Sequence, residues 1–337
     1  MLLPTTYSAT IIALILTAVL WGLWPSTLKL DRKWRFELYA FDFAIGCLLT
    51  ALALALTLGN AGSSNTFTFE DNLTIAGKRN IGTAIAAGVL FALGHFLTLA
   101  GIALAGMSTA MPVAGAVALL TGTAVYAIQT HASTGGMSNA GLYYAGAGLA
   151  VSALAASYIA QKAGAAAVPR RKGMYAGWKS YILAACGGLF IGAYPMAMES
   201  SRNGEIGLGS YAAVLFLAIG ALLATPLYSL YFLNLPVQGE AIGVGAYFQG
   251  SGKQHVLGLL GGAMWACGAV ALYGSAGNTF PDAPKTAAVI AAGLGAAAVG
   301  AVSGLTIWKE GSETGKALPT AAALLLAGAV ALQFLGA

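Results

Sequence analysis

The sequence predicts an all-α membrane protein with ten transmembrane helices. Of its 337 residues, 58% are hydrophobic and only 8% are charged, and the mean hydropathy is +0.78. A soluble protein carries about a quarter charged residues, so this composition excludes a soluble globule. The apolar residues form runs of about twenty, the length of a membrane-spanning helix, without the ten-residue alternation of an outer-membrane strand.

Ten apolar runs, separated by polar or Gly/Pro-rich breaks, define the predicted spans. In chain order they are Tyr7–Leu28, Phe36–Leu58, Asn80–Leu104, Met107–Ile128, Asn139–Ala160, Ser180–Glu199, Leu208–Phe232, His255–Tyr273, Thr286–Trp308 and Ala317–Phe334. The first 28 residues contain no Lys or Arg, so the basic region of a secretory signal is missing. We therefore expect the first run to be a mature span.

The basic residues predict the orientation of the chain. Connections after odd-numbered spans contain twelve of them: Lys29, Arg32, Lys33, Arg35, Lys162, Arg170, Arg171, Lys172, Lys179, Lys253, Lys309 and Lys316. Connections after even-numbered spans contain four: Lys78, Arg79, Arg202 and Lys285. Since cytoplasmic loops are rich in Lys and Arg, we expect both termini outside a bacterial inner membrane. Trp34, Trp178 and Trp308 lie beside basic connections, where we expect headgroup anchors.

Several functional classes find no support in the sequence. The net charge of +5 comes from basic residues scattered between apolar runs, which predicts no nucleic-acid-binding face. Cys47, Cys186 and Cys267 are far apart and lack ligand spacing, so we expect neither a disulfide nor a metal site. HExxH, GxSxG and P-loop motifs are absent, so we predict no enzyme and no cofactor, with proton or sodium as the coupling ion of any active transport.

The two halves of the chain resemble each other. Trp21–Leu28 ends the first span and Ile191–Met198 ends the sixth, and both place an aromatic–Pro pair after Gly at an offset of 170 residues. Tyr39–Gly46 similarly resembles Tyr211–Gly220. Because five spans separate the copies, the second must lie upside down, a recurrent construction in secondary transporters. We predict one five-helix repeat in 1–162, a basic cytoplasmic linker in 163–179 and a second repeat in 180–337.

The prolines and glycines inside the spans are consistent with a transporter built from two inverted repeats. Pro25, Pro112 and Pro195 each remove a helix hydrogen bond, which either frees a carbonyl for a polar group or simply kinks the helix for packing. GxxxG pairs begin at Gly188, Gly258 and Gly300. They allow close helix approach, within the bundle or also between the subunits of a homodimer.

Few charges lie inside the spans, so each is informative. Asp42 is about 9 Å inside the second span, too deep to reach water easily, and needs either a partner or a cavity. Tyr39, Asp42 and Gly46 share one helix face, which predicts an acceptor beside an aromatic wall. Glu37 lies nearer the basic connection, where pairing with Arg35 or Lys33 is expected, although it is also a coupling candidate.

Two further titratable residues are candidates. His95 lies in the middle of the third span and either contacts a ligand or proton or is a buried packing residue. Glu199 ends the sixth span near Arg202. It could form an outer gate, form a salt bridge with Arg202 or take part in coupling. A desolvated carboxylate could bind a proton in one conformational state only, but the sequence does not choose between Asp42 and Glu199.

Four aromatic residues lie inside the spans and away from most basic connections: Trp21, Trp24, Tyr194 and Trp265. Their rings could stack on a sugar or a planar heterocycle, and an indole N–H could orient a carbonyl. Ordinary helix packing is the alternative. With Tyr39, Asp42 and His95, they form the predicted substrate-binding set.

The order of five segments resembles the drug/metabolite transporter superfamily, in its branch of glucose/ribose porters, rhamnose–proton symporters and ureide permeases. These segments are Trp21–Lys29, Trp34–Phe43, Gly101–Val113, Gly261–Trp265 and Ile307–Glu310. The resemblance implies two inverted five-helix repeats and cation-coupled uptake of small polar solutes. The polar stretch Asn278–Lys285 departs from the small-residue run expected before the ninth span.

The function predicted from the sequence is cation-coupled uptake of a sugar, ureide or nucleobase-like solute by alternating access. An exporter of metabolites or lipophilic cations of the same superfamily is the alternative. A membrane scaffold without transport activity is a further alternative, which predicts a sealed core. The expected partners are a small-molecule substrate, the lipid bilayer and, through the GxxxG faces, a second copy of the chain.

Overall fold

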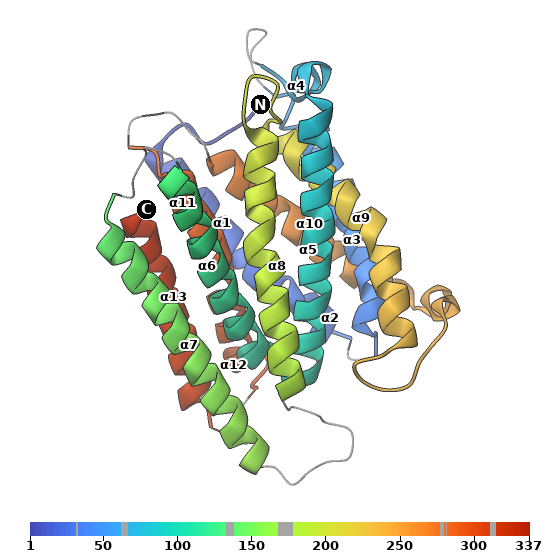
Figure 1. Cartoon of the computed structure of the whole chain (residues 1–337). Coiled ribbons are helices and arrows are strands. Elements are labelled where there is room, and N and C mark those ends of the chain that lie inside the picture. Colours follow the sequence, from blue (N-terminus) through green and yellow to red (C-terminus); the bar gives the residue numbers. More distant parts are fainter. Residues whose placement is uncertain are drawn as a thin grey trace.

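The computed structural model describes residues 1–31, 33–61, 67–132, 138–167, 178–276, 280, 282–310 and 315–337. These residues form a helical bundle (Figure 1). Its α-helices are α1 (Tyr7–Leu23), α2 (Pro25–Lys29), α3 (Phe36–Leu56), α4 (Phe69–Ile75), α5 (Lys78–Ala105), α6 (Met107–Ala132), α7 (Ala140–Ala167), α8 (Trp178–Arg202), α9 (Ser210–Asn234), α10 (Gly252–Ser275), α11 (Thr286–Leu294), α12 (Ala296–Thr306) and α13 (Ala317–Gly336). A 3-10 helix, η1 (Val244–Gln249), precedes α10.

The ten predicted spans are confirmed. Among the described residues, ten helical stretches are long and apolar enough to cross a membrane, with α1–α2 and α11–α12 each counting as one. Large side chains such as Ile12, Leu223 and Leu227 are exposed on their outer faces, as lipid-facing positions require. Within the predicted linker 163–179, residues 168–177 lie outside the described part, as do Arg32 and Asn278.

Backbone hydrogen bonds define two ends of the bundle. At the first, here called the termini end, Leu2 N donates to Leu58 O (2.9 Å), Gly77 N to Ile206 O (2.9 Å) and Asn139 N to Gly336 O (2.9 Å). Both termini lie there (Figure 1). The other end, here called the basic end, carries Lys29, Arg35, Lys179, Lys253 and Lys309. Since successive spans alternate in direction, α1 runs away from the termini end and α8 runs toward it.

Two spans are broken near their middle or end. The first breaks at Trp24, because Pro25 has no N–H to donate to the preceding turn, and α2 continues from there. The ninth breaks at Gly295, between Leu294 and Ala296. Pro112 and Pro195, for which the sequence predicts a lost helix hydrogen bond and a kink, lie inside the continuous helices α6 and α8.

Glycine faces bring neighbouring helices into backbone contact. In each of the three GxxxG pairs the glycines face another helix of the same chain. Gly188 and Gly192 face carbonyl oxygens of α6, Gly258 and Gly262 face α3, and Gly304 faces the start of α6. These pairs therefore serve packing within the bundle, and their faces are covered by the chain itself.

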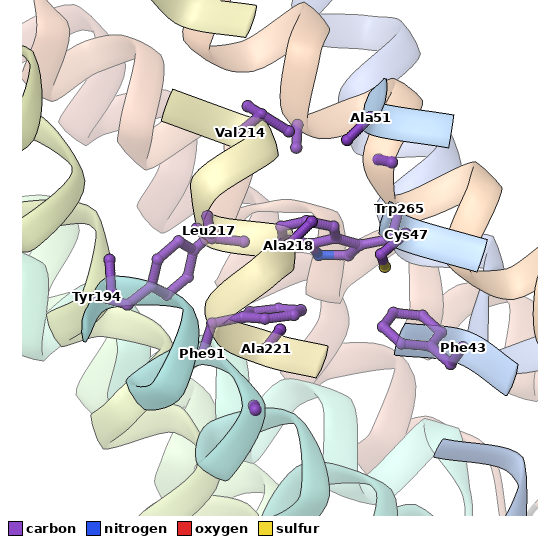
Figure 2. Packing of buried hydrophobic residues seen from close by; sticks show 14 of the residues in the cluster. Phe43, Cys47, Ala51, Phe91, Tyr194, Val214, Leu217, Ala218, Ala221 and Trp265 are labelled. Carbon is purple, nitrogen blue, oxygen red and sulfur yellow. The ribbon is translucent and has the colours of Figure 1, made fainter. Parts of the chain in front are cut away.

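The largest apolar cluster lies where α3, α5, α9 and α10 meet. Figure 2 shows Phe91 of α5, Tyr194 of α8 and Trp265 of α10 beside Leu217 and Ala218 of α9. All five side chains are buried. Three of these side chains are aromatic rings from three different helices, and Phe91 contacts both Tyr194 and Trp265.

Replacing Gly88 by Ala should destabilise the fold, because the new Cβ would collide with the backbone of α9 at Leu217. Overpacking of this kind costs about 1–3 kcal/mol. Gly82 lies on the same helix with open space around it, so Gly82→Ala should stabilise by up to about 1 kcal/mol through helix propensity. Thermal unfolding of both purified variants tests this, and equal melting temperatures would contradict it.

Candidate functional site

A cavity of about 80 Å³ lies inside the bundle. Five of the seven predicted substrate-binding residues line it: Trp21, Trp24, His95, Tyr194 and Trp265. They come from α1, the break after α1, α5, α8 and α10, so both halves of the chain contribute. The other lining residues include Phe91 and Thr98 of α5 and small residues of α6, α11 and α12.

The aromatic rings around this cavity form two stacks. In the first, Trp21 and Trp265 are parallel within 4° at a centroid distance of 5.4 Å, and Phe91 lies 4.1 Å from Trp265. The Trp21 Nε1–H donates to the Trp265 carbonyl oxygen at 2.8 Å. In the second, His95 stacks on Trp24 (4.5 Å) and on Phe43 (4.0 Å), and the Trp24 and Phe43 rings also contact each other at 5.0 Å. The cavity is therefore walled by flat, rigid surfaces.

Two buried polar groups of α5 border the cavity without a hydrogen-bond partner. They are Nε2 of His95, which is 4% exposed, and Oγ1 of Thr98, which is 7% exposed. A buried polar group without a partner costs about 1–3 kcal/mol. Both residues line the cavity, and the Thr98 hydroxyl lies beside Gly187 of α8. The cavity thus combines aromatic walls with sparse polar groups on one helix.

Tyr39 and Asp42 do not line this cavity. They share one face of α3 with Gly46, as predicted, but this face packs against α10. The Thr27 hydroxyl donates to the Trp24 carbonyl oxygen at 2.8 Å, so the Tyr39 hydroxyl donates to Thr27 at 2.7 Å. Tyr39 therefore links α3 to the broken first span, one turn from the cavity.

Asp42 has the partners that its depth requires. Its carboxylate is buried and accepts a hydrogen bond from the Tyr247 hydroxyl at 2.6 Å. Nδ1 of His255 lies 3.0 Å from both carboxylate oxygens. Burial raises the pKa of Tyr247 well above its usual range, and the adjacent carboxylate raises it further, so Tyr247 acts as a neutral donor.

The tryptophans predicted as headgroup anchors differ in their surroundings. Trp178 is 76% exposed, as an anchor would be. Trp34 is buried against Tyr247 and His255, because the segment between α9 and α10 folds back over it. The anchor prediction is therefore wrong for Trp34. Trp308 is partly buried and donates from Nε1 to the Ser26 hydroxyl at 3.0 Å.

The two remaining coupling candidates are both ion-paired. Glu37 is 1% exposed and receives two hydrogen bonds from Arg35, at 2.7 and 3.3 Å, which confirms the predicted pairing. Glu199 pairs with Arg202 at 3.0 Å. Glu199 also lines a second cavity of about 150 Å³ near the termini end. In the part of the chain that the structure describes, no three His, Cys, Asp or Glu side chains are arranged to hold a metal ion.

His255 and Tyr247 are site residues that sequence reasoning missed. A signal was present, because α3 and α10 both begin at the basic end, so Asp42 and His255 lie in early turns of neighbouring spans. The position of His255 is also set by a capping box in which Ser251 and Gln254 bond each other's backbone. Tyr247 could not be placed from its sequence, since it lies outside the spans, in the short 3-10 helix η1 between α9 and α10.

Comparisons with known proteins show partial similarity to two plant permeases. Ureide permease 4 of Arabidopsis thaliana is 33% identical over 115 residues, which are 33% of this chain and 28% of that protein. Ureide permease 1 of the same plant is 30% identical over 115 residues, covering 33% and 29%. The matched region thus spans less than a third of these relatives. It supports the predicted resemblance to ureide permeases, and the superfamily and its sugar-transporting branches remain predictions.

Similarity of fold extends further than similarity of sequence. No family model matches the chain. A solved structure described only as a crystal structure of a protein superposes with a TM-score of 0.53 over 98% of both chains, at 17% identity. That likeness concerns the fold alone. The ten apolar helices and the similarity to two permeases support a multi-pass membrane protein.

Replacing Tyr247 by Phe should loosen η1, because the bond to the buried Asp42 carboxylate is lost. Hydrogen bonds to charged groups contribute about 1.5–3 kcal/mol, so amide exchange over 244–250 should accelerate about tenfold or more. Tyr231→Phe, at an exposed tyrosine of α9, is the matched control and should leave that exchange unchanged. Equal amide exchange in the two variants would contradict the role of the Tyr247–Asp42 hydrogen bond in holding η1 in place.

Proposed function

We propose that this protein is a secondary transporter that binds a small, flat, polar solute in the aromatic cavity and exposes it alternately to the two sides of the membrane. The observation that carries the proposal is the meeting of Trp21, Trp24, His95, Tyr194 and Trp265 from both halves around one cavity. Similarity to two ureide permeases supports transport rather than catalysis.

The cavity chemistry favours a ureide or nucleobase-like ring over a sugar or a lipophilic cation. Parallel indoles offer stacking faces to a planar solute. His95 and Thr98 each offer one unpartnered polar atom, fewer than the ring of hydroxyl groups of a sugar would need. Among the described lining residues there is no carboxylate to pair with a cation.

Helix packing supports the proposed pair of inverted repeats. If each span is exchanged with the span five further along, the contact of α5 with α8 becomes that of α10 with α1. In the same way α5–α9 becomes α10–α3, and α6–α8 becomes α12–α1. All these contacts are present, α1 and α8 run in opposite directions, and the related residues Trp24 and Tyr194 line the same cavity.

Asp42 remains the candidate for coupling transport to a cation gradient. It lies outside the cavity but directly before Phe43, whose ring stacks on His95 at 4.0 Å. A change in the charge or position of Asp42 could therefore be transmitted through Phe43 and His95 to a solute in the aromatic cavity. Glu37 and Glu199, the other candidates, are each held by an arginine.

The two alternatives make different demands on the structure. A scaffold needs no interior space, so the cavity and its unpartnered polar atoms weigh against it. An exporter would use the same cavity, because the direction of secondary transport is set by the solute and ion gradients. We propose a bacterial inner membrane as the location, with both termini outside according to the positive-inside rule.

Planar ureides or nucleobases should raise the melting temperature of the purified protein, whereas sugars and quaternary amines should not. Thr98→Val, which keeps the side-chain volume, should weaken that binding about five- to tenfold because one hydrogen bond is lost. Trp265→Phe should weaken it about tenfold through lost stacking. The measurement is the melting temperature against solute concentration, with and without sodium.

Trp178→Phe is the matched control, since this indole is exposed at the start of α8, and should bind like the parent. Stabilisation by sugars alone would overturn the planar substrate class. If none of the four solute classes binds, or if binding is indifferent to Thr98 and Trp265, the aromatic cavity is not the solute site.

Asp42→Asn should abolish gradient-driven accumulation in proteoliposomes while sparing exchange of solute across the membrane. The physical reason is that the amide keeps the size of the side chain but not its charge. Asp71→Asn, at an exposed carboxylate that caps α4, should accumulate solute normally. Unchanged accumulation in Asp42→Asn would remove this residue as the coupling site.

A further inference from the structure

The second cavity lies between the aromatic cavity and the termini end of the bundle. Near that end it is bordered by Tyr126 of α6, Tyr143 of α7, Glu199 of α8, Thr286 of α11 and Gln333 of α13. Its volume is about 150 Å³. Carboxylate, hydroxyl and amide side chains thus line a space that precedes the largely apolar one.

One residue lines both cavities. Leu294, the last residue of α11, is 6% exposed and borders each of them. Along α6, the lining of the aromatic cavity ends at Ala118 and that of the second cavity begins at Leu119. Because Leu294 directly precedes the break at Gly295, its side chain sits at a joint between two helices. A single aliphatic side chain at a helix break can move without unfolding a span.

The opposite side of the aromatic cavity is closed by a group of interactions at the basic end. The Glu310 carboxylate accepts hydrogen bonds from the backbone N–H groups of Met107 (3.1 Å) and Ser108 (2.6 Å), at the start of α6. It also pairs with Lys29, whose ammonium lies 5.5 Å from the Trp308 ring centroid. The ends of α2, α6 and α12 are thereby joined.

The closure at the basic end has favourable electrostatics. A helix N-terminus carries unpaired N–H groups and a partial positive charge, so a carboxylate bound there is stabilised. Gly304 lies against the Ser108 N–H and the same carboxylate, where a larger side chain would collide. Its lack of a side chain lets α12 approach α6 closely.

We infer that the solute reaches the aromatic cavity from the termini end, through the second cavity and past Leu294, and that Glu310 with Lys29 forms the gate that closes the basic end. This inference rests on the proposed transport function. In this state a thin barrier, the Leu294 side chain, separates the aromatic cavity from the second cavity, whereas the Glu310 and Lys29 interactions close the basic end.

Cysteine accessibility tests the thin barrier in a background where Cys47, Cys186 and Cys267 are replaced by Ala. Ile290→Cys, in the second cavity, should react quickly with 2-aminoethyl methanethiosulfonate. Ala114→Cys, in the aromatic cavity, should react at least tenfold more slowly. Adding Leu294→Ala should accelerate the Ala114→Cys reaction at least tenfold.

Leu324→Ala removes the same atoms from an exposed position of α13 and is the matched control, which should leave both rates unchanged. Equal rates at Ala114→Cys with and without Leu294→Ala would overturn the barrier role of Leu294. So would an Ala114→Cys rate equal to that of Ile290→Cys in the parent. Melting temperatures near the parent value establish that the variants are folded.

A near-isosteric reporter tests the gate at the basic end. Ser108→Cys is buried and should be unreactive in the parent. Glu310→Gln should make it reactive, by at least tenfold, and Lys29→Gln should act in the same direction. If opening one end closes the other, Ile290→Cys should slow severalfold in the same variants. Glu205→Gln, at an exposed carboxylate, should change neither rate.

These rates are measured without solute, so they are independent of whether the proposed function holds. If the cysteines react at the expected rates but no solute binds, the proposed pathway stands and the transport proposal is overturned. Solute binding with Ser108→Cys unreactive in both Glu310→Gln and Lys29→Gln would overturn the gate and leave the transport proposal in place.

Discussion

The close approach of helix backbones is the constraint on which the rest of this structure depends. Between two helices in lipid the hydrophobic effect adds little, so association relies on packing, and Gly or Ala at the contact allows it. Here Gly258 and Gly262 allow α3 to pack closely against α10, while Gly188 and Gly192 allow α6 to pack closely against α8. With the contacts made by small residues, the aromatic side chains are free to gather around one interior space.

Two polar regions of the interior are kept apart by this packing. The aromatic cavity holds unpartnered groups of α5, whereas the buried carboxylate of Asp42 is fully engaged by Tyr247 and His255. This division agrees with the proposed substrate class, since a carboxylate inside the aromatic cavity would attract cations in preference to a neutral planar solute. Two short links join the two regions: Phe43 beside Asp42, and Tyr39 with Thr27 beside Trp24.

Much of the fold was predictable because a membrane span must satisfy its own backbone hydrogen bonds, which requires a long apolar helix. The gathering of Trp21, Trp24 and Trp265 was predictable because, of the six tryptophans, only these three lie inside spans and away from the basic connections. Periodicity also placed Tyr39 and Asp42 on one face, but periodicity does not say which neighbour that face meets. The burial of Trp34 was not predictable, because it depends on a loop more than two hundred residues further along the chain. The break at Gly295 was hidden among many similar glycines.

The parallel pair of Trp21 and Trp265 has a spectroscopic consequence. Two indoles held 5.4 Å apart within 4° of parallel have electronically coupled transitions, which give a characteristic near-ultraviolet circular dichroism signal. Because both rings line the aromatic cavity, a solute that displaces either indole changes this signal. The molecule therefore carries an optical reporter of its own interior, readable without a label and in either detergent or lipid.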